Sequence, residues 1–146
     1  MYDQLKLDNQ ICFRLYTASR LITQAYRPLL EPLGLTYPQY LVLMVLWEKD
    51  NQLVNDIARR LLLDTNTITP LLKRMETQGL LVRTHGIVDG RQTLVSLTRK
   101  GHRLQEQVKN IPSCLSSQLA ANGLCADDAT TLASTIDRII NTLKKQ

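Results

Sequence analysis

Cys12 lies in the segment LDNQICFRLY (residues 7–16), near the start of what looks like an amphipathic helix, and Tyr16 follows it by about one helical turn. A deprotonated and accessible cysteine is a nucleophile that can serve as an oxidation sensor. A free cysteine is also a small hydrophobic residue that is often buried. Cys12 is therefore either a packing residue or a redox sensor, and other features of the sequence are needed to distinguish the two roles.

The chain has three cysteines at wide spacing: Cys12, Cys114 and Cys125. No Cys-x-x-Cys pair and no nearby pair of histidines accompanies them, so we expect no metal site and no cofactor. No secretory leader is visible, and an odd count in a reducing compartment argues against a disulfide framework. Packing or redox chemistry remains for the thiols.

An enzyme that uses Cys12 would need a base beside the nucleophile. The two histidines are His85 and His102, and both fall on segments expected to lie far from Cys12. We therefore expect that the protein is not an enzyme.

The positive charge is concentrated in one segment. The chain has 146 residues and a net charge of +5, and residues 59–103 alone contain nine Lys or Arg and three Asp or Glu, which leaves the rest at −1. Such a segment favours an anionic partner over a solvated basic surface. The longest apolar run, YLVLMVLW (residues 40–47), is too short to cross a bilayer, so we expect a cytoplasmic protein with no membrane partner.

The hydrophobic pattern predicts mostly helices. Thr36 caps one of them, and AANGLCADD separates the last two. The predicted helices cover residues 7–30, 36–48, 98–119 and 126–144.

Two short helices joined by a tight turn are predicted between these elements, which is a helix-turn-helix pattern. The second begins at a cap, Asp64 or Thr65, and stops at Gly79. LLVRTH (residues 80–85) and QTLVSL (residues 92–97) read as strands joined by a glycine turn. The predicted fold is mainly α with a small β-hairpin wing, a winged helix-turn-helix. The second helix is expected to bury Ile68, Leu71, Leu72 and Met75.

The second helix of this motif exposes short polar side chains in its first turn and two cations further along. Hydroxyls and amides at a helix N-terminus suit base edges and phosphates in a major groove. The alternative is that the threonines cap the helix and the cations are merely solvated. These candidates are Thr65, Asn66, Thr67, Thr69, Lys73 and Arg74.

The hairpin tip pairs Asp89 with Arg91 across a glycine. An aspartate there can orient the guanidinium toward an AT-rich minor groove, with Arg83 and Arg99 flanking it against the phosphates. The alternative is a surface ion pair of little energetic value.

Four stretches together resemble the MarR family of transcriptional repressors, and within it the subgroup that senses organic hydroperoxides. They are LDNQICFRLYTASR, YRPLLEPLGLTYPQYLVLMVLWE, LLLDTNTITPLLKRMETQGLLVR and DGRQTLVSLTRKG. The resemblance covers residues 7–101 closely and the last two helices loosely.

This resemblance implies a single 1–146 domain that forms a homodimer through residues 1–34 and 99–146. Residues 35–98 would form the DNA-binding part, which reads a pseudo-palindromic double-stranded operator. It implies that Cys12 is the sensing thiol and that Tyr26 and Tyr37 of the partner subunit bond it. The implied DNA contacts are Thr65, Asn66, Thr67, Pro70, Lys73, Asp89 and Arg91.

The chain departs from the family pattern at a few positions. Thr65-Asn66 replaces the usual Ser-Gly, and Gly90 replaces an acidic residue. Relatives with two cysteines carry the second one at the position of Ser117. Here the nearby thiol is Cys114, one helical turn before Ser117. Cys114, Cys125 and small cellular thiols are the candidates for forming a disulfide with oxidised Cys12.

Oxidation of Cys12 by organic hydroperoxides is then expected to release the operator. If Asp8 caps the first helix, the helix dipole favours the Cys12 thiolate. Two alternatives stay open. In one, a phenolic or acidic ligand controls the repressor and Cys12 only packs; in the other, the chain is a nucleoid protein without operator preference.

Overall fold

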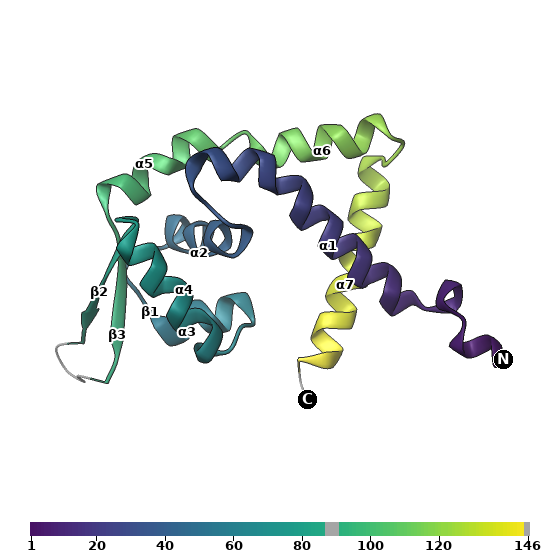
Figure 1. The fold of residues 1–146 in the computed structure, drawn as a ribbon, viewed down its shortest axis with the longest axis horizontal. Coiled ribbons are helices and arrows are strands. Elements are labelled where there is room, and N and C mark those ends of the chain that lie inside the picture. Colours follow the sequence, from purple (N-terminus) through teal and green to yellow (C-terminus); the bar gives the residue numbers. More distant parts are fainter. Residues whose placement is uncertain (87–90, 145–146) are drawn as a thin grey trace. The chain divides into compact units, whose positions relative to one another are not determined.

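The computed structural model describes residues 1–86 and 91–144 (Figure 1). The chain divides into two compact units, Met1–Lys109 and Asn110–Gln146. The first unit contains most of the buried core and all three strands. Its helices are α1 (Ile11–Leu30), α2 (Tyr37–Glu48), α3 (Val54–Leu61), α4 (Thr65–Thr77) and α5 (Arg99–Val108), with short 3-10 turns η1 (Asp3–Leu5), η2 (Leu7–Asn9) and η3 (Glu31–Leu33).

The first helix begins later than predicted. Residues 7–9 form η2, and α1 starts at Ile11 after an extended Gln10, so Asp8 does not cap it. The Asn9 side chain donates to the Asp3 carbonyl at 2.8 Å, and the Gln10 side chain donates to the Gln4 carbonyl. These bonds from side chains to backbone stabilise the turns at the expense of a longer helix.

Helix α2 begins as predicted at Thr36. The Thr36 hydroxyl accepts from the Gln39 amide at 3.4 Å, and the Gln39 side chain accepts from the Thr36 amide at 3.2 Å, which is a capping box. The rest of α2 is almost wholly apolar and fills the core of the first unit. No single helix of the described residues is long and apolar enough to cross a bilayer; only Ile11–Leu33 and Tyr37–Glu48 taken together are, and they are bent by 74°.

The helix-turn-helix is formed by α3 and α4. Leu62 ends α3 in the left-handed region at φ 55°, which turns the chain toward α4. Helix α4 buries one face, as the spacing predicts. Its buried residues are Ile68, Leu71, Leu72 and Met75.

The hairpin consists of β2 (Leu81–His85) and β3 (Thr93–Leu97), as predicted, with Leu81 opposite Leu97. A third strand was not predicted: β1 (Gln52–Leu53) pairs antiparallel with β3, so the sheet order is β1-β3-β2. Two residues are too few to show an alternating pattern, and their pairing with β3 is non-local. The structure therefore confirms the predicted winged helix-turn-helix and adds a strand to its sheet.

The predicted helix over residues 98–119 was wrong, because the chain forms two helices there. Helix α5 ends at Val108, and α6 (Ile111–Ala121) begins after Asn110 with Pro112 in its first turn. Proline has no amide hydrogen and clashes with the carbonyl four residues earlier, so it suits a helix start and not an interior. In the second unit α6 is followed by α7 (Ala126–Leu143), and Cys125 is the last residue of the loop between them and the N-cap of α7.

Gly101 allows α5 to approach the turn between α4 and β2 closely. Its carbonyl accepts from Trp47 Nε1 at 3.0 Å, and a Cβ at this position would lie 2.2 Å from the Leu80 carbonyl oxygen. We expect Gly101→Ala to lower the free energy of unfolding by about 1–3 kcal/mol, measured by urea denaturation. Helix propensity alone predicts the opposite sign, a gain of about 0.5–1 kcal/mol. A stabilised variant would therefore show that this backbone contact is not close.

Candidate nucleic-acid interface and sensor thiol

All the DNA-contact residues that the sequence predicted on α4 lie on its solvent-exposed face. The side chains opposite its buried stripe are exposed. The hydroxyls of Thr65, Thr67 and Thr69 make no hydrogen bond within residues 1–86 and 91–144, and the cap position is taken by Asp64, whose side chain makes no capping bond. The alternative that these threonines cap the helix is therefore not supported. The exposed residues are Thr65, Asn66, Thr67, Thr69, Pro70, Lys73 and Arg74.

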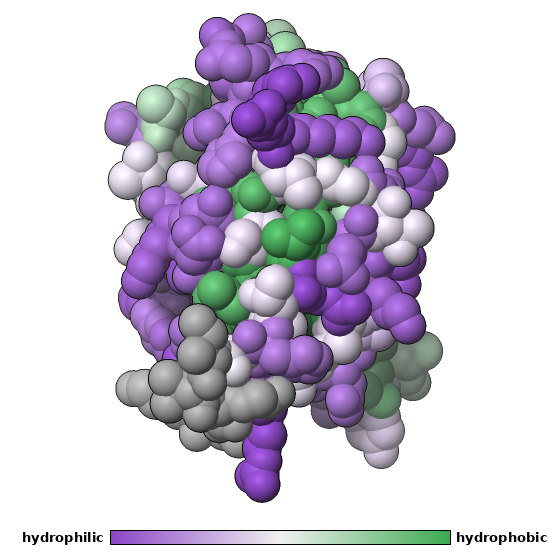
Figure 2. All heavy atoms as spheres, turned by 90° about the vertical axis from the view of Figure 1, so that its left-hand side faces the viewer, coloured by the Kyte–Doolittle hydropathy of each residue, from purple (hydrophilic) through white to green (hydrophobic). Residues whose placement is uncertain are grey.

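A polar cleft of about 420 Å³ lies beside this face. The first turns of α3 and α4 form one side of it, and the hairpin forms the other. Figure 2 views the molecule from the hairpin side, and hydrophilic residues make up most of that face. The side chains that could meet an anion in the cleft are Asn55, Thr65, Thr69, Arg83, Arg91, Gln92 and Thr93.

The Arg83 guanidinium is paired with a carboxylate, and its predicted phosphate contact stays a prediction. The guanidinium lies against Glu76 of α4, with Nη2 3.3 Å and Nε 3.4 Å from Oε1. The Arg83 amide also donates to Glu76 Oε2 at 2.9 Å. This amide bond, with the guanidinium, holds the pKa of Glu76 below its usual value.

The tip of the hairpin is described only in part. Arg91 is exposed and leads into β3, and the Gly86 amide donates to the Gln92 carbonyl at 2.7 Å to close the hairpin. Asp89 lies outside the described residues. The predicted pairing of Asp89 with Arg91 therefore stays a prediction.

Cys12 is the second residue of α1 and is exposed. The helix buries only one of its residues, Leu30. Packing within its own chain therefore does not explain the thiol, and an exposed thiol at a helix start meets the access requirement of a sensor.

Tyr26 and Tyr37 lie together, with ring centroids 4.9 Å apart, and Tyr40 joins them at 5.9 Å from Tyr26. Burial, and then the neighbouring Tyr26, raise the pKa of Tyr37, so its hydroxyl stays protonated at neutral pH and can donate. Tyr26 follows Cys12 by 14 residues of one continuous helix, about 21 Å along its axis. Tyr26 and Tyr37 of the same chain are therefore too far from Cys12 to bond it.

Comparison with known proteins places this geometry in a family. A family model described as transcriptional regulator SarA/Rot matches residues 24–108. The chain is also 41% identical, over 99% of its length and 97% of the relative's, to the organic hydroperoxide resistance transcriptional regulator of Bacillus subtilis strain 168. The chain belongs to the MarR/SarA family of transcriptional regulators. The family consists of regulators and not enzymes, which confirms the expectation made for this chain.

Two solved structures of AbfR of Staphylococcus epidermidis are similar to this MarR/SarA chain. Reduced AbfR bound to DNA is 38% identical and matches with a TM-score of 0.79, over 97% of this chain and 96% of that one. AbfR with its disulfide formed is 39% identical and matches with a TM-score of 0.66, over 94% and 95%.

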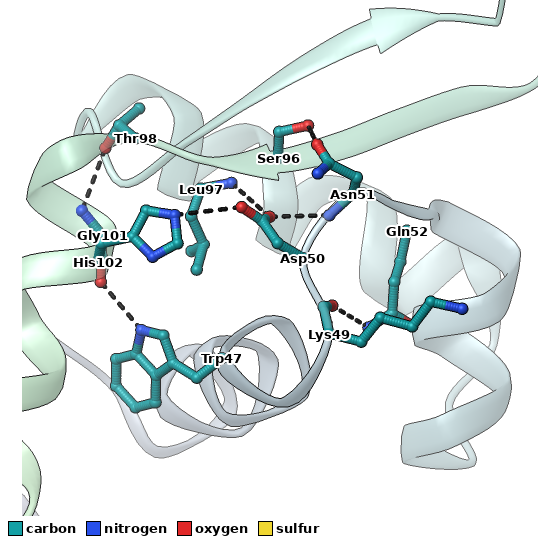
Figure 3. A network of polar contacts seen from close by, with 10 residues as sticks. All are labelled: Trp47, Lys49, Asp50, Asn51, Gln52, Ser96, Leu97, Thr98, Gly101 and His102. Carbon is teal, nitrogen blue, oxygen red and sulfur yellow. Dashed lines mark hydrogen bonds and ion pairs between the residues drawn. The ribbon is translucent and has the colours of Figure 1, made fainter.

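A polar network that the sequence did not indicate supports the sheet of this MarR/SarA regulator (Figure 3). Asp50 Oδ1 accepts from the amides of Asn51 at 2.8 Å and Leu97 at 2.9 Å, and Asp50 Oδ2 lies 3.2 Å from His102 Nε2. One carboxylate thus joins the turn after α2 to β3 and α5. A lone aspartate after an apolar helix suggests only a turn, so nothing in the sequence points to these partners.

The other two cysteines are both exposed, but their surroundings differ. Cys114 lies on α6, and Cys125 caps α7. The Cys125 thiol donates to Asp128 Oδ2 at 3.0 Å and its amide donates to the same oxygen at 3.1 Å. The thiol bond first, then the amide bond, lowers the pKa of Asp128.

A second pocket, of about 320 Å³, lies between α1 and the start of α2. Arg27 and Tyr37 are among its lining residues, together with apolar Leu30 and Leu35. The Glu31 carboxylate also lines the pocket, so Arg27 is the group there that could pair with a small acidic or phenolic molecule.

Proposed function

We propose that this protein is a homodimeric repressor that binds a pseudo-palindromic DNA operator and releases it when organic hydroperoxides or related oxidants oxidise Cys12. The observation that carries the proposal is the exposed Cys12 thiol at the start of α1, in a chain 41% identical to an organic hydroperoxide resistance regulator. The cytoplasm, where the operator is, is its expected location.

The DNA-binding part of the proposal is supported by α4 and the hairpin. The polar face of α4 is exposed, and the hydroxyls of Thr65, Thr67 and Thr69 make no hydrogen bond within the described residues, so they are available to base edges and phosphates. AbfR, which is similar over nearly the whole chain, is bound to DNA in its reduced form. In the proposal α4 enters the major groove and Arg91, oriented by Asp89, enters the minor groove.

The dimer is supported by apolar surface that a single chain leaves uncovered. Helix α7 buries none of its residues, although it carries Leu132, Ile139, Ile140 and Leu143 along one face. Helix α1 likewise exposes Ile11, Phe13, Leu21 and Ile22. Exposed apolar residues along two helices mark an association surface, and in the proposal a second copy covers them symmetrically.

The sensing reaction begins at the Cys12 sulfur. The thiolate attacks one peroxide oxygen of ROOH, the O–O bond breaks, and the alkoxide takes a proton to leave as ROH, which gives Cys12–SOH. A second thiol then displaces water from the sulfenic acid to form a disulfide. In the proposal the partner's Tyr26 and Tyr37 donate hydroxyl bonds to the Cys12 thiolate, because Tyr26 and Tyr37 of the same chain are out of reach.

We expect Arg91→Ala to weaken operator binding by about 1–3 kcal/mol and to relax any preference for AT pairs under the wing.

Wild-type binding should fall steeply with salt, because the basic segment is doubled in a dimer and releases counterions from the phosphates. Fluorescence anisotropy over a salt series measures both effects. A flat plot of log affinity against log salt would show that the basic segment does not face DNA.

The resolving thiol is expected to be Cys114 of the partner and not Cys125. The Cys125 thiol is engaged with the Asp128 carboxylate, which makes it a poorer nucleophile, whereas the Cys114 thiol has no hydrogen bond among the described residues. Non-reducing electrophoresis after peroxide should show a covalent dimer that is lost in Cys12→Ser and Cys114→Ser. If Cys125→Ser lost the covalent dimer and Cys114→Ser kept it, Cys125 would be the resolving thiol.

A second candidate function rests on the pocket at Arg27. In it a small acidic or phenolic ligand releases the operator and Cys12 takes no part. Peroxide would then leave DNA binding intact, while Arg27→Ala would abolish the response to the ligand. Treating the wild-type protein with both kinds of signal distinguishes the two functions.

A further inference from the structure

Glu76 lies at the C-terminal end of α4, where a negative charge is electrostatically unfavourable for the helix. Its side chain reaches across to β2 and accepts three hydrogen bonds, all from Arg83. Both side chains are partly shielded, with 23% of Arg83 and 37% of Glu76 exposed. The contact across the turn therefore accounts for a glutamate at this position.

The contact also supplies an acceptor for one backbone amide at the open edge of the sheet. Strand β2 pairs only with β3, so its outer edge has no strand neighbour. The Arg83 amide is a donor on that edge, and Glu76 Oε2 accepts from it at 2.9 Å. An unpaired edge donor that finds an acceptor on a helix ties the strand to that helix.

Only residues 78–80 connect α4 to β2, and Gly79 turns the chain there at φ 76°. A glycine turn by itself allows a range of angles between the two elements. The Glu76–Arg83 contact lies outside this turn and bridges the elements a second time. The turn and the contact together restrict the angle between α4 and β2, whereas the turn alone would leave that angle variable.

We propose that Glu76 and Arg83 form a brace that sets the position of the wing relative to α4, and that Arg83 acts on operator binding through this brace and not by contacting a phosphate. The proposal rests on the proposed function, in which α4 and the hairpin enter neighbouring grooves. DNA grooves have fixed spacing, so a wing that shifts against α4 loses its fit to the operator.

The two roles of Arg83 predict opposite effects for Glu76. If Arg83 contacts a phosphate, removing Glu76 frees the guanidinium, removes an acidic group near DNA and strengthens binding. If the pair is a brace, removing either partner weakens binding to the operator. The sign of the change for Glu76→Ala therefore separates the roles.

The first experiment measures operator and random-duplex affinity over a salt series for Glu76→Ala, Arg83→Met and the double variant. We expect each single variant to bind the operator about tenfold more weakly, with the double variant no weaker than either, because both lose the same interaction. The salt slope should stay at the wild-type value. Tighter binding by Glu76→Ala, or a slope reduced by about one in Arg83→Met, would overturn the brace.

The controls are Glu106→Ala and Lys109→Met, which remove the same charges from an exposed ion pair of 2.8 Å between α5 and its C-cap residue. They should leave operator affinity within about twofold of wild type, since exposed pairs contribute little. An equal loss in these controls would show that net charge, and not the brace, causes the effect.

Amide hydrogen exchange tests the brace without DNA. Exchange of the Arg83 amide should become faster in Glu76→Ala and stay near wild type in Glu76→Gln, whose side-chain oxygen still accepts from it. Unchanged exchange in a folded Glu76→Ala protein would overturn the brace. Failure of the wild-type protein to bind any operator would instead overturn the proposed function, and the exchange data would still report the contact.

Discussion

We expect the Cys12→Ser protein to stay on operator DNA after an organic hydroperoxide is added, whereas the wild-type protein should be released. Serine is nearly the size of cysteine and position 12 is exposed, so the variant should fold, dimerise and bind as before. Its hydroxyl cannot form a sulfenic acid or a disulfide. We expect peroxide to lower wild-type affinity by about 5–150-fold, the usual size of coupling between two sites, and to leave Cys12→Ser unchanged. Gel-shift titration before and after oxidation measures the difference.

Cys125→Ser is the matched control, because it removes another exposed thiol by the same change. It should respond to peroxide as the wild-type protein does. Intact mass identifies the product on Cys12, either a sulfenic acid or a disulfide. Full release of a Cys12→Ser protein by peroxide would end the sensor proposal, whereas a wild-type protein that peroxide does not release would favour the ligand pocket at Arg27.

Ile139→Asp is expected to separate the dimer and to abolish tight operator binding. Ile139 lies within the exposed apolar stripe of α7, and a buried carboxylate at an interface is costly to desolvate. A monomer reads one half-site and loses the gain from simultaneous contact, about 10²–10⁴-fold in affinity. Sedimentation equilibrium and operator titration of the same preparation measure both effects.

Asn141→Asp is the control for this change. It adds a negative charge to the same helix, but position 141 lies on the side of α7 away from the apolar stripe. The control should remain dimeric and bind normally. A dimeric Ile139→Asp protein with normal affinity would show that α7 does not form the interface.

The sequence by itself determined the elements whose signals are local. Thr36 and Gln39 lie three residues apart, and that spacing alone specifies the capping box that starts α2. The buried and exposed faces of α4 follow from helical spacing, and the hairpin strands follow from composition and the glycines between them. Pro112 was also a readable local signal, since a proline there favours the start of a second helix over a continuous one.

Only the tertiary structure decided which side chains meet. Arg83 looked like a phosphate contact because its charge was visible in the sequence, but its partner Glu76 is set by how β2 approaches α4. Likewise, the fold brings Tyr26 to within 4.9 Å of Tyr37 and joins Asp50 to β3 and α5. Local spacing sets backbone conformation through neighbours three or four residues away, whereas these pairs depend on the relative placement of whole elements, which packing of the shared core determines.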